Sequence, residues 1–401
     1  MEINKGLVNG SIVLLVAFGV YNFFNFVFQL TMARMLSVTD YGILATIFSF
    51  IYILSVFTES IQLIISKYTT KENDEGKLKN IFKRSLKKSF LSSSILFFAY
   101  LIITIYLSDL LKIEFLLLAI SGIIIFSSFL LPVTRGIMQG EKRFRSLGLN
   151  MVSESLIKLF FSVLFVFLGF RVYGAIIGAI IGFIVSFVFS FYSIKDILVV
   201  KEKITKTLGI YVYARPVFFI TLVTILFYSI DIVIARIVFS PEISGMYAIA
   251  SILSKAIFWG THPISRAMFP LSAENNMNKN KSRNVFLNAF LILCGLIIVA
   301  LFLFYFSPMF IVKIFSGKTL LESANILFYL GLGTSIISLA NLILIYKLSL
   351  GRTKGYHYLF IFSIIEILLL FYFSHSLIEF SIAFVTASSI FLFGSIFLMN
   401  E

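Results

Sequence analysis

Cysteine and histidine are scarce in this sequence of 401 residues, which contains one cysteine and three histidines. Cys294 lies inside an apolar run, so no disulfide can form within the chain, and we expect the thiol to pack among apolar side chains. Protein metal sites use several such ligands at short spacing. The histidines are too scattered for this, at His262, His357 and His375. We therefore predict no metal site and no cofactor.

Charged residues are also few, at 13% of the chain, whereas soluble proteins have about a quarter. Hydrophobic residues make up 59%, and 48 residues are phenylalanine. This composition predicts an integral membrane protein. The formal net charge of +14 does not indicate a nucleic-acid partner, because Lys and Arg of membrane proteins collect in their cytoplasmic loops.

Long apolar runs recur through the chain with polar breaks between them, and about 20 apolar residues suffice to cross a bilayer as a helix. The predicted fold class is an all-α integral membrane protein with twelve transmembrane helices. The first run, from Leu7, is too long for a signal peptide, so we expect it to remain as the first span. The predicted spans are 7–32, 42–66, 86–108, 113–139, 147–170, 172–194, 210–238, 244–270, 284–306, 320–346, 355–373 and 378–399.

Lys and Arg fall mainly in alternate loops between these spans. Since short cytoplasmic loops carry the positive charge, this alternation places both termini in the cytoplasm and predicts a multi-pass protein of the inner cell membrane. The richest segment, 67–88, carries the basic residues of the stretch LKNIFKRSLKKSF, which covers 78–90. We expect it to lie along the membrane surface as an amphipathic helix, or to serve only as a topology anchor.

The two halves of the chain resemble each other. ARMLSVTDY before Gly42 matches ARIVFSPEIS before Gly245 at an offset of about half the chain length. Six spans in each half bring both halves into the membrane in the same direction, which is a parallel repeat. We therefore predict a six-helix lobe at 1–195, a cytoplasmic linker at 196–208 and a second six-helix lobe at 209–401.

Small residues repeat every four positions in the sixth predicted span, at Gly174, Gly178 and Gly182. Such a stripe allows two helices to approach closely. We interpret it as a packing surface and not as a functional site.

Three stretches carry a resemblance to a known family: ARMLSVTDYG, the GIMQGEKRFRSLG segment from Gly136, and the run from Asp231 through ARIVFSPEISGMY. They resemble the polysaccharide biosynthesis or oligosaccharide flippase family of the multidrug, oligosaccharidyl-lipid and polysaccharide exporter superfamily. The resemblance implies a two-lobed, MATE-like transporter that moves polyprenyl-pyrophosphate-linked glycans from the cytoplasmic to the outer leaflet. It also implies membrane lipid as a partner, and a glycan polymerase or glycosyltransferases as protein partners. The chain lacks the extra pair of spans seen in some lipid-linked precursor flippases, which argues against the peptidoglycan branch.

Five basic residues fall inside the predicted spans, where a charge is costly and usually faces a cavity or a partner. Our functional hypothesis is that they line a cationic cavity between the lobes that holds the pyrophosphate. Arg suits this role because its planar fork bonds phosphate oxygens in pairs. For the three arginines, snorkelling to the cytoplasmic interface is an equally simple explanation. The candidates are Arg135, Lys158, Arg215, Lys255 and Arg266.

Four acidic residues also fall inside spans: Glu59, Glu154, Asp231 and Glu366. Glu154 and Lys158 are four residues apart on one helix face, so a local ion pair is the plainest explanation for both. Glu366 has no such partner, which makes it the first candidate for carrying a proton or sodium ion. Asp231 lies near the outer end of its span and can instead be a solvated structural residue.

Two other functions compete with glycan transport. A sodium- or proton-coupled multidrug exporter of the same superfamily would favour a cavity of net negative charge with aromatic walls. Five basic residues against four acidic ones point the other way. A membrane enzyme is disfavoured, because the sequence has no nucleophile motif and no sizeable extracytoplasmic segment, so we predict no catalytic residue.

Overall fold

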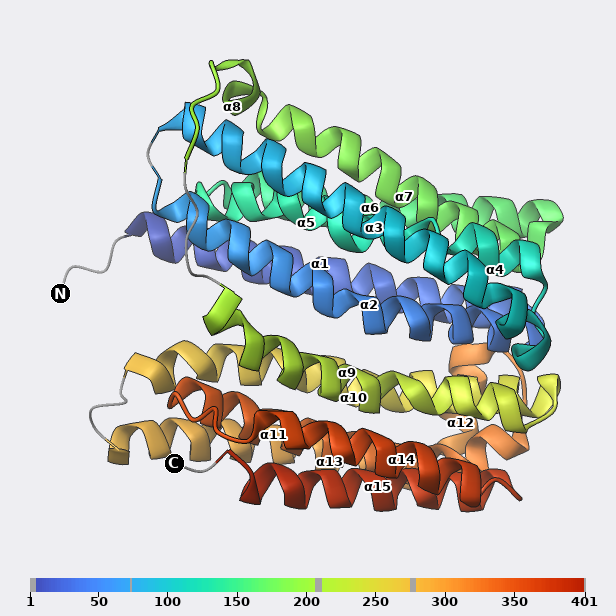
Figure 1. Cartoon of the computed structure of the whole chain (residues 1–401). Coiled ribbons are helices and arrows are strands. Elements are labelled where there is room, and N and C mark those ends of the chain that lie inside the picture. Colours follow the sequence, from blue (N-terminus) through green and yellow to red (C-terminus); the bar gives the residue numbers. More distant parts are fainter. Residues whose placement is uncertain (1–4, 73, 206–210, 275–278, 400–401) are drawn as a thin grey trace. The chain divides into compact units, whose positions relative to one another are not determined.

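The computed structural model describes residues 5–72, 74–205, 211–274 and 279–399, and this part of the chain contains helices and no strand (Figure 1). The helices of the first part are α1 (Lys5–Met35), α2 (Val38–Thr70), α3 (Glu75–Leu111), α4 (Phe115–Ser121), α5 (Ile124–Gly140), α6 (Phe144–Phe165), the π-helix η1 (Val166–Phe170), α7 (Arg171–Ser193) and α8 (Lys195–Val199).

The second part of the chain continues in the same way. Its helices are α9 (Tyr211–Val238), α10 (Pro241–Glu274), α11 (Lys279–Phe306), α12 (Pro308–Ser316), α13 (Leu321–Ser349), the 3-10 helix η2 (Tyr356–Tyr358), α14 (Leu359–Tyr372) and α15 (Leu377–Phe397).

Ten helical segments in the described residues are long and apolar enough to cross a membrane. One of them, Phe144–Ser193, holds the two helices α6 and α7, which meet where Gly169 and Arg171 have positive φ. A shorter apolar helix covers Tyr356–Tyr372. Counting α6 and α7 separately and adding this helix gives twelve, so the predicted all-α membrane fold is confirmed.

The contacts of the chain group into two compact units. The first unit is Met1–Leu36 with Leu54–Ala214, and the second is Ser37–Ile53 with Arg215–Glu401. The first turns of α2 therefore group with the second unit, although α2 is one continuous helix. The predicted lobes 1–195 and 209–401 stay a prediction.

The repeated sequence explains how the first turns of α2 pack in the second unit. Gly42 on α2 and Gly245 on α10 are the corresponding glycines of the repeat, and they lie against each other. A Cβ added to Gly42 would lie 2.8 Å from the Gly245 Cα, and one on Gly245 would lie 2.2 Å from the Val38 carbonyl oxygen. Only a residue without a side chain allows this approach of two backbones.

We expect Gly245→Ala to destabilise the protein by about 1–3 kcal/mol, because the added methyl group meets backbone atoms that cannot move aside. Thermal unfolding in detergent, followed by circular dichroism, measures the effect. Gly260→Ala on the same helix is the matched control, since no atom lies within 4 Å of its added Cβ. Equal unfolding temperatures for the two variants would contradict the expected clash.

The glycine stripe of α7 packs against α6, as predicted. A Cβ on Gly178 would lie 2.3 Å from the Ser162 Oγ, and one on Gly182 would lie 2.9 Å from the Glu154 carbonyl oxygen. At Gly174 the nearest atom would be the Phe165 carbonyl carbon, at 2.8 Å. These glycines thus bring α7 close to the helix that carries two of the candidate charges.

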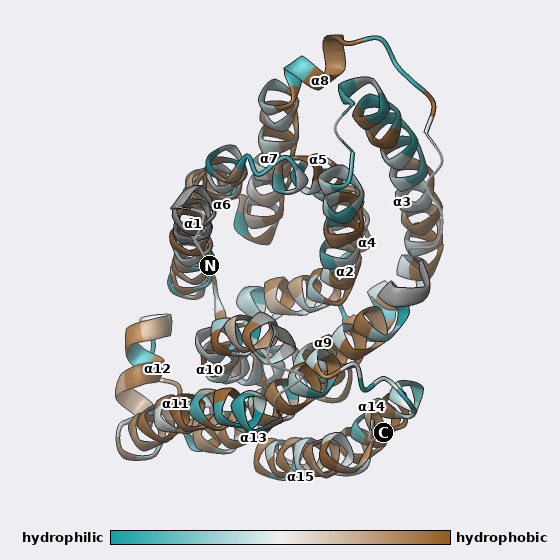
Figure 2. Ribbon diagram, turned by 90° about the vertical axis from the view of Figure 1, so that its left-hand side faces the viewer, coloured by the Kyte–Doolittle hydropathy of each residue, from teal (hydrophilic) through white to brown (hydrophobic). Residues whose placement is uncertain are grey.

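The basic stretch LKNIFKRSLKKSF does not form a helix of its own, and the expectation of a separate surface helix is wrong. It forms the first turns of α3, which runs on without a break into its apolar part. Figure 2 shows hydrophilic residues at the start of α3 and on α8.

The predicted linker is fastened to the start of α3 as far as residue 205, and its residues 206–208 lie outside the described residues. The Lys79 Nζ donates to the Leu198 and Val200 carbonyl oxygens at 2.6 and 2.7 Å. The Lys203 backbone N–H donates to the Gly76 carbonyl oxygen at 3.0 Å. A basic helix start thus serves as the anchor of this segment.

Acidification is expected to loosen this attachment. Lys203 pairs with Asp74 at 2.6 Å and lowers the pKa of that carboxyl below its ordinary 3.8. Lys83 pairs with Glu202 at 2.7 Å and lowers the pKa of that carboxyl below 4.5. A group with a lowered pKa in the folded state stabilises it above the unfolded-state pKa, and this contribution is lost as pH falls through the lowered value.

Hydrogen-exchange mass spectrometry measures this effect. We expect the protection factor of the Lys203 N–H to be constant above pH 4.5 and to fall below pH 3.8. In Glu202→Gln the part of the change that comes from Glu202 should disappear. A protection factor unchanged at pH values well below 3.8 would show that the two ion pairs do not hold the segment.

Candidate functional site

A buried ion pair lies inside the second unit, where α9 carries Asp231 and α10 carries Lys255. The Lys255 Nζ lies 2.8 Å from the Asp231 Oδ1, and the two side chains are 3% and 0% exposed. The other carboxylate oxygen, Oδ2, accepts hydrogen bonds from the Tyr247 hydroxyl at 3.0 Å and the Ser251 hydroxyl at 2.7 Å. We call these four residues the Asp231 cluster. Both carboxylate oxygens have donors, which is the condition for tolerating a buried charge.

Aromatic rings continue this cluster. The Lys255 Nζ lies 4.9 Å from the centroid of the Tyr228 ring, within the range of a cation–π interaction. The Tyr228 hydroxyl accepts a hydrogen bond of 2.5 Å from the indole N–H of Trp259, the only tryptophan of the chain. The Tyr52 ring stands edge-on to Tyr228 at 6.1 Å. One aromatic ring, that of Tyr228, thus contacts the lysine of the pair, and Trp259 and Tyr52 pack against this ring.

Glu366 on α14 is the third ionisable residue of this region. Its side chain is completely buried, and neither carboxyl oxygen has a hydrogen-bond partner among the described residues. It lies close enough to Asp231 and Lys255 to interact with both electrostatically. No hydrogen-bond donor among the described residues would therefore compensate a charge on this carboxyl group.

One face of α10 connects the Asp231 cluster to exposed polar side chains. Ser251, Lys255, Trp259, His262 and Arg266 follow one another at steps of four, four, three and four residues, which places them on one face of a helix. Ser251 and Lys255 are buried, His262 is partly exposed, and Trp259 and Arg266 are exposed. We call this row the polar face of α10.

A second buried ion pair lies inside the first unit. The Arg135 Nη2 on α5 lies 2.6 Å from the Glu154 Oε2 on α6, and Nε donates to the Asn150 Oδ1 at 2.8 Å. The Asn150 amide in turn donates to the Ser186 carbonyl oxygen of α7 at 2.7 Å. Arg135 is only 5% exposed, so snorkelling is the wrong explanation for this residue. The sequence did not predict Arg135 as the partner of Glu154.

Lys158 contacts two residues of α1. Its Nζ donates a hydrogen bond to the Asn25 Oδ1 and lies 4.6 Å from the centroid of the Phe28 ring. Glu154 is near enough to attract its charge as well. The predicted local pair of Glu154 and Lys158 is thus at most one part of a larger arrangement that joins α1, α5 and α6.

The remaining predicted residues lie outside both clusters. Arg215, Arg266 and Glu59 have exposed side chains. Asp231, in contrast, is 0% exposed, so the alternative of a solvated residue is wrong.

Sequence reasoning missed Lys347, which it placed in a loop. Lys347 is buried at 7% exposure, and its Nζ donates to the Ile396 and Leu398 carbonyl oxygens at 2.5 Å each. It thus binds the carboxyl end of α15, where a helix carries partial negative charge. In the sequence Lys347 directly follows the predicted span 320–346, and nothing there indicates that its side chain binds the end of a different helix.

No group of three or more His, Cys, Asp or Glu residues that could bind a metal ion occurs in the part of the chain that the structure describes. The described residues do contain two ion pairs between helices, a buried carboxyl group without a hydrogen-bond donor, and exposed arginines within predicted spans.

The sequence matches the family described as polysaccharide biosynthesis protein over residues 7–276. No curated protein matches it.

Solved structures share the fold at low sequence identity. A multidrug resistance MATE family transporter of the MOP superfamily, in an inward-facing conformation, is 15% identical, with a TM-score of 0.74 over 96% of this chain and 98% of that one. The lipid II flippase MurJ, in an inward closed conformation, is 17% identical, with a TM-score of 0.71 over 96% of this chain and 87% of that one. A MOP superfamily transporter from Pyrococcus furiosus, described as having reverse polarity of its binding pocket, is 16% identical, with a TM-score of 0.65 over 98% of this chain and 94% of that one.

Proposed function

The chain belongs to the polysaccharide biosynthesis protein family, and from this membership we propose that it flips polyprenyl-pyrophosphate-linked oligosaccharide from the cytoplasmic to the outer leaflet by alternating access. The observation that carries the proposal is the polar face of α10. A helix that crosses the membrane here bears Lys255 and Arg266 on one face, with Trp259 between them. Charged side chains are rare in such helices and usually serve the transported substrate.

The exposed arginines are the best candidates for direct contact with the pyrophosphate. Arg215 and Arg266 are exposed within predicted spans, and a guanidinium can bond two phosphate oxygens at once. Lys255 and Arg135 have carboxylate partners, Asp231 and Glu154. Their charges become available to an anion only when these pairs open. The proposed binding of pyrophosphate thus uses both exposed charges and charges released by a change of partner.

Ion coupling is assigned to Glu366. The Glu366 carboxyl interacts electrostatically with Asp231 and Lys255, so release of a proton from it would place a second negative charge there that competes with Asp231 for the Lys255 ammonium group. Uptake of a proton would restore the original pair. Asp231 and Glu154 take part as the carboxylates that release Lys255 and Arg135. Glu59 is exposed, and we assign it no role.

The proposed function also implies a location and partners for the protein. We propose the inner cell membrane as its location, with both termini in the cytoplasm, because Lys and Arg fall mainly in alternate loops of the sequence. Its partners are the lipid-linked glycan, membrane lipid and the glycan polymerase or glycosyltransferases that act before and after transport. The chain acts as a transporter and not as an enzyme.

Deletion of the gene tests the function. We expect surface glycan to be lost and the lipid-linked precursor to accumulate inside the cell. Normal surface glycan in the deletion strain would refute the flippase function. Complementation with Arg215→Ala or Arg266→Ala should fail, whereas Arg283→Ala, an exposed arginine at the start of α11, should restore export. Export by both site variants at the wild-type level would refute the cationic site alone.

The aromatic rings of this region favour a second candidate, a sodium- or proton-coupled multidrug exporter. Tyr228, Trp259 and Tyr52 pack against one another beside Lys255, and the acids Asp231 and Glu366 interact electrostatically with this lysine. Aromatic rings with acids suit organic cations. Uptake of dansylated drugs into inverted vesicles distinguishes the two functions. Gradient-driven uptake by the wild-type protein, together with normal glycan in the deletion strain, would favour the exporter.

A further inference from the structure

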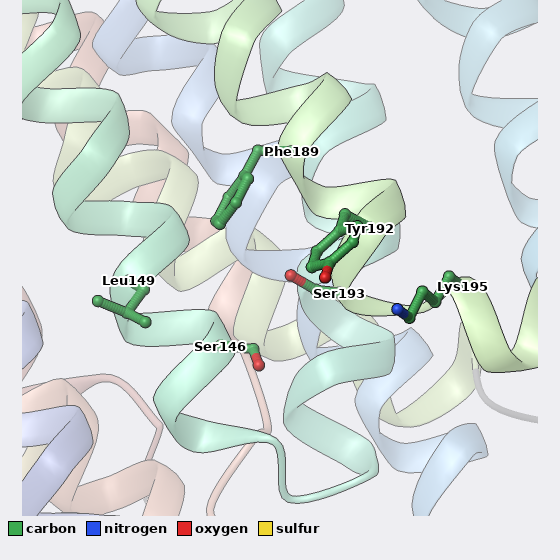
Figure 3. A pocket seen from close by; sticks show the side chains of 6 residues that line it. All are labelled: Ser146, Leu149, Phe189, Tyr192, Ser193 and Lys195. Carbon is green, nitrogen blue, oxygen red and sulfur yellow. The ribbon is translucent and has the colours of Figure 1, made fainter.

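A hollow of about 350 Å³ lies in the first unit where α6 begins and α7 ends (Figure 3). α6 contributes Ser146 and Leu149, and α8 contributes its first residue, Lys195. None of its residues belongs to the clusters described above. Phe189, Tyr192 and Ser193 of α7 complete the lining.

The hollow has a positive charge at one edge. The Lys195 Nζ lies 4.5 Å from the centroid of the Tyr192 ring, and Lys195 makes no ion pair within the described residues. The neighbouring Arg143 is engaged instead, by Asp196 and by Glu141 at 3.9 Å. Lys195 therefore remains available to an anion.

The other edge of the hollow is apolar and continues along both helices. On α6, Leu149, Leu156 and Phe160 are 56%, 41% and 63% exposed. On α7, Val185 and Phe189 are each 41% exposed. These residues recur at steps of four or seven, so each helix presents one apolar stripe. An exposed apolar stripe on a membrane-crossing helix is a surface for acyl chains.

The segment after α7 supports a position at the membrane surface. Val199 at the end of α8 is 85% exposed and Ile204 is 88% exposed. Apolar side chains beside lysines on a short surface segment are typical of the boundary between lipid headgroups and acyl chains. Such a segment suits a hollow whose charged edge lies at the depth of lipid phosphates and whose apolar edge lies at the depth of the acyl chains.

We propose that this hollow binds an anionic phospholipid of the leaflet that adjoins the basic loops. Its phosphate meets Lys195 and the hydroxyl groups of Ser146 and Ser193, and one acyl chain lies over Leu149 and Phe189. The volume falls at the lower end of the range of small-molecule sites, roughly 300–1,000 Å³, so it holds a headgroup rather than a whole lipid. The inference does not depend on which substrate is transported.

Native mass spectrometry of the purified full-length protein tests the proposal with added phosphatidylglycerol or phosphatidylcholine. We expect Lys195→Glu to weaken phosphatidylglycerol binding by roughly fivefold or more, because one surface charge has about this effect on anionic lipid. Lys201→Glu is the matched control, as an exposed lysine six residues further on. Phosphatidylcholine binding should be the same in all three proteins. Equal phosphatidylglycerol binding by the wild type and Lys195→Glu would overturn the proposal.

Location and occupant are tested separately. Phosphatidylglycerol with a photoreactive acyl chain should crosslink to Leu149 or Phe189, and crosslinks confined to other helices would overturn the site. Inorganic phosphate at the same concentration should not compete, and polyprenyl phosphate should compete no better than phosphatidylglycerol. Competition by inorganic phosphate would reduce the site to a simple anion site, and preferential binding of polyprenyl phosphate would assign it to the substrate carrier.

Discussion

Replacement of Lys255 by methionine is expected to destabilise the protein by about 3–5 kcal/mol, because removal of one partner leaves a buried charge without compensation. The Asp231 carboxylate would keep only the Tyr247 and Ser251 hydroxyl groups as donors. The side chain of Asp231 is completely buried, so water cannot replace the lost ammonium group without a rearrangement of α9 and α10.

The double variant Asp231→Asn, Lys255→Met separates charge from packing. It removes both charges, and the asparagine carbonyl can still accept from Tyr247 and Ser251. We therefore expect it to recover most of the lost stability. Thermal unfolding followed by circular dichroism measures the cycle, with Lys88→Met at an exposed lysine as control. If the single variant loses less than about 1 kcal/mol, the pair is not the structural element inferred from its burial.

Export provides the second readout of this cycle. If Lys255 meets the pyrophosphate, the double variant should be stable and inactive. A stable double variant with wild-type export would leave the pair with a structural role only.

Replacement of Glu366 by glutamine is expected to leave stability nearly unchanged and to abolish the response of transport to an ion gradient. Glutamine resembles the uncharged carboxyl in size and polarity, so the buried site should accept it. It cannot exchange a proton or bind a cation as a carboxylate does. The loss of coupling should therefore occur without loss of folded protein.

Transport by the reconstituted protein under an imposed proton or sodium gradient measures this effect. Wild-type transport should be stimulated and that of Glu366→Gln should not. Glu379→Gln is the control, because Glu379 on α15 is half exposed and its loss should leave coupling intact. Equal stimulation of the wild type and Glu366→Gln would assign the coupling to other residues.

The sequence predicted the membrane helices well because their signal is local. A run of about 20 apolar residues indicates by its length alone a helix that crosses a bilayer. Local signals were less informative at breaks within a span. The run 113–139 consists of α4 and α5, which meet at Gly122 and Ile123, and hydropathy does not distinguish this from one helix.

The members of the candidate site were easier to predict than their partners. Asp231, Lys255 and Glu366 were identified one by one, because each is an ionisable residue in an apolar run. Their association could not be predicted, since they lie on three helices and hydropathy does not fix how one helix is rotated against another. For the same reason the pairing of Arg135 with Glu154 could not be predicted. In the sequence, Glu154 has a nearer possible partner on its own helix, Lys158.

Neutral partners left no signal at all. Asn25, Asn150 and Tyr247 are ordinary polar residues in the sequence, and only their hydrogen bonds to charged side chains distinguish them. A search for polar residues in apolar runs would have found the two asparagines but not their roles.

The single tryptophan makes the protein its own optical probe. All indole emission comes from Trp259, whose N–H is bonded to Tyr228 and whose ring lies 6.3 Å from that of Tyr52. Emission wavelength and quantum yield respond to the polarity and charge around the ring. Substrate arrival or a change of partner at Lys255 should therefore be visible in the unlabelled wild-type protein, in real time and without any engineered fluorophore.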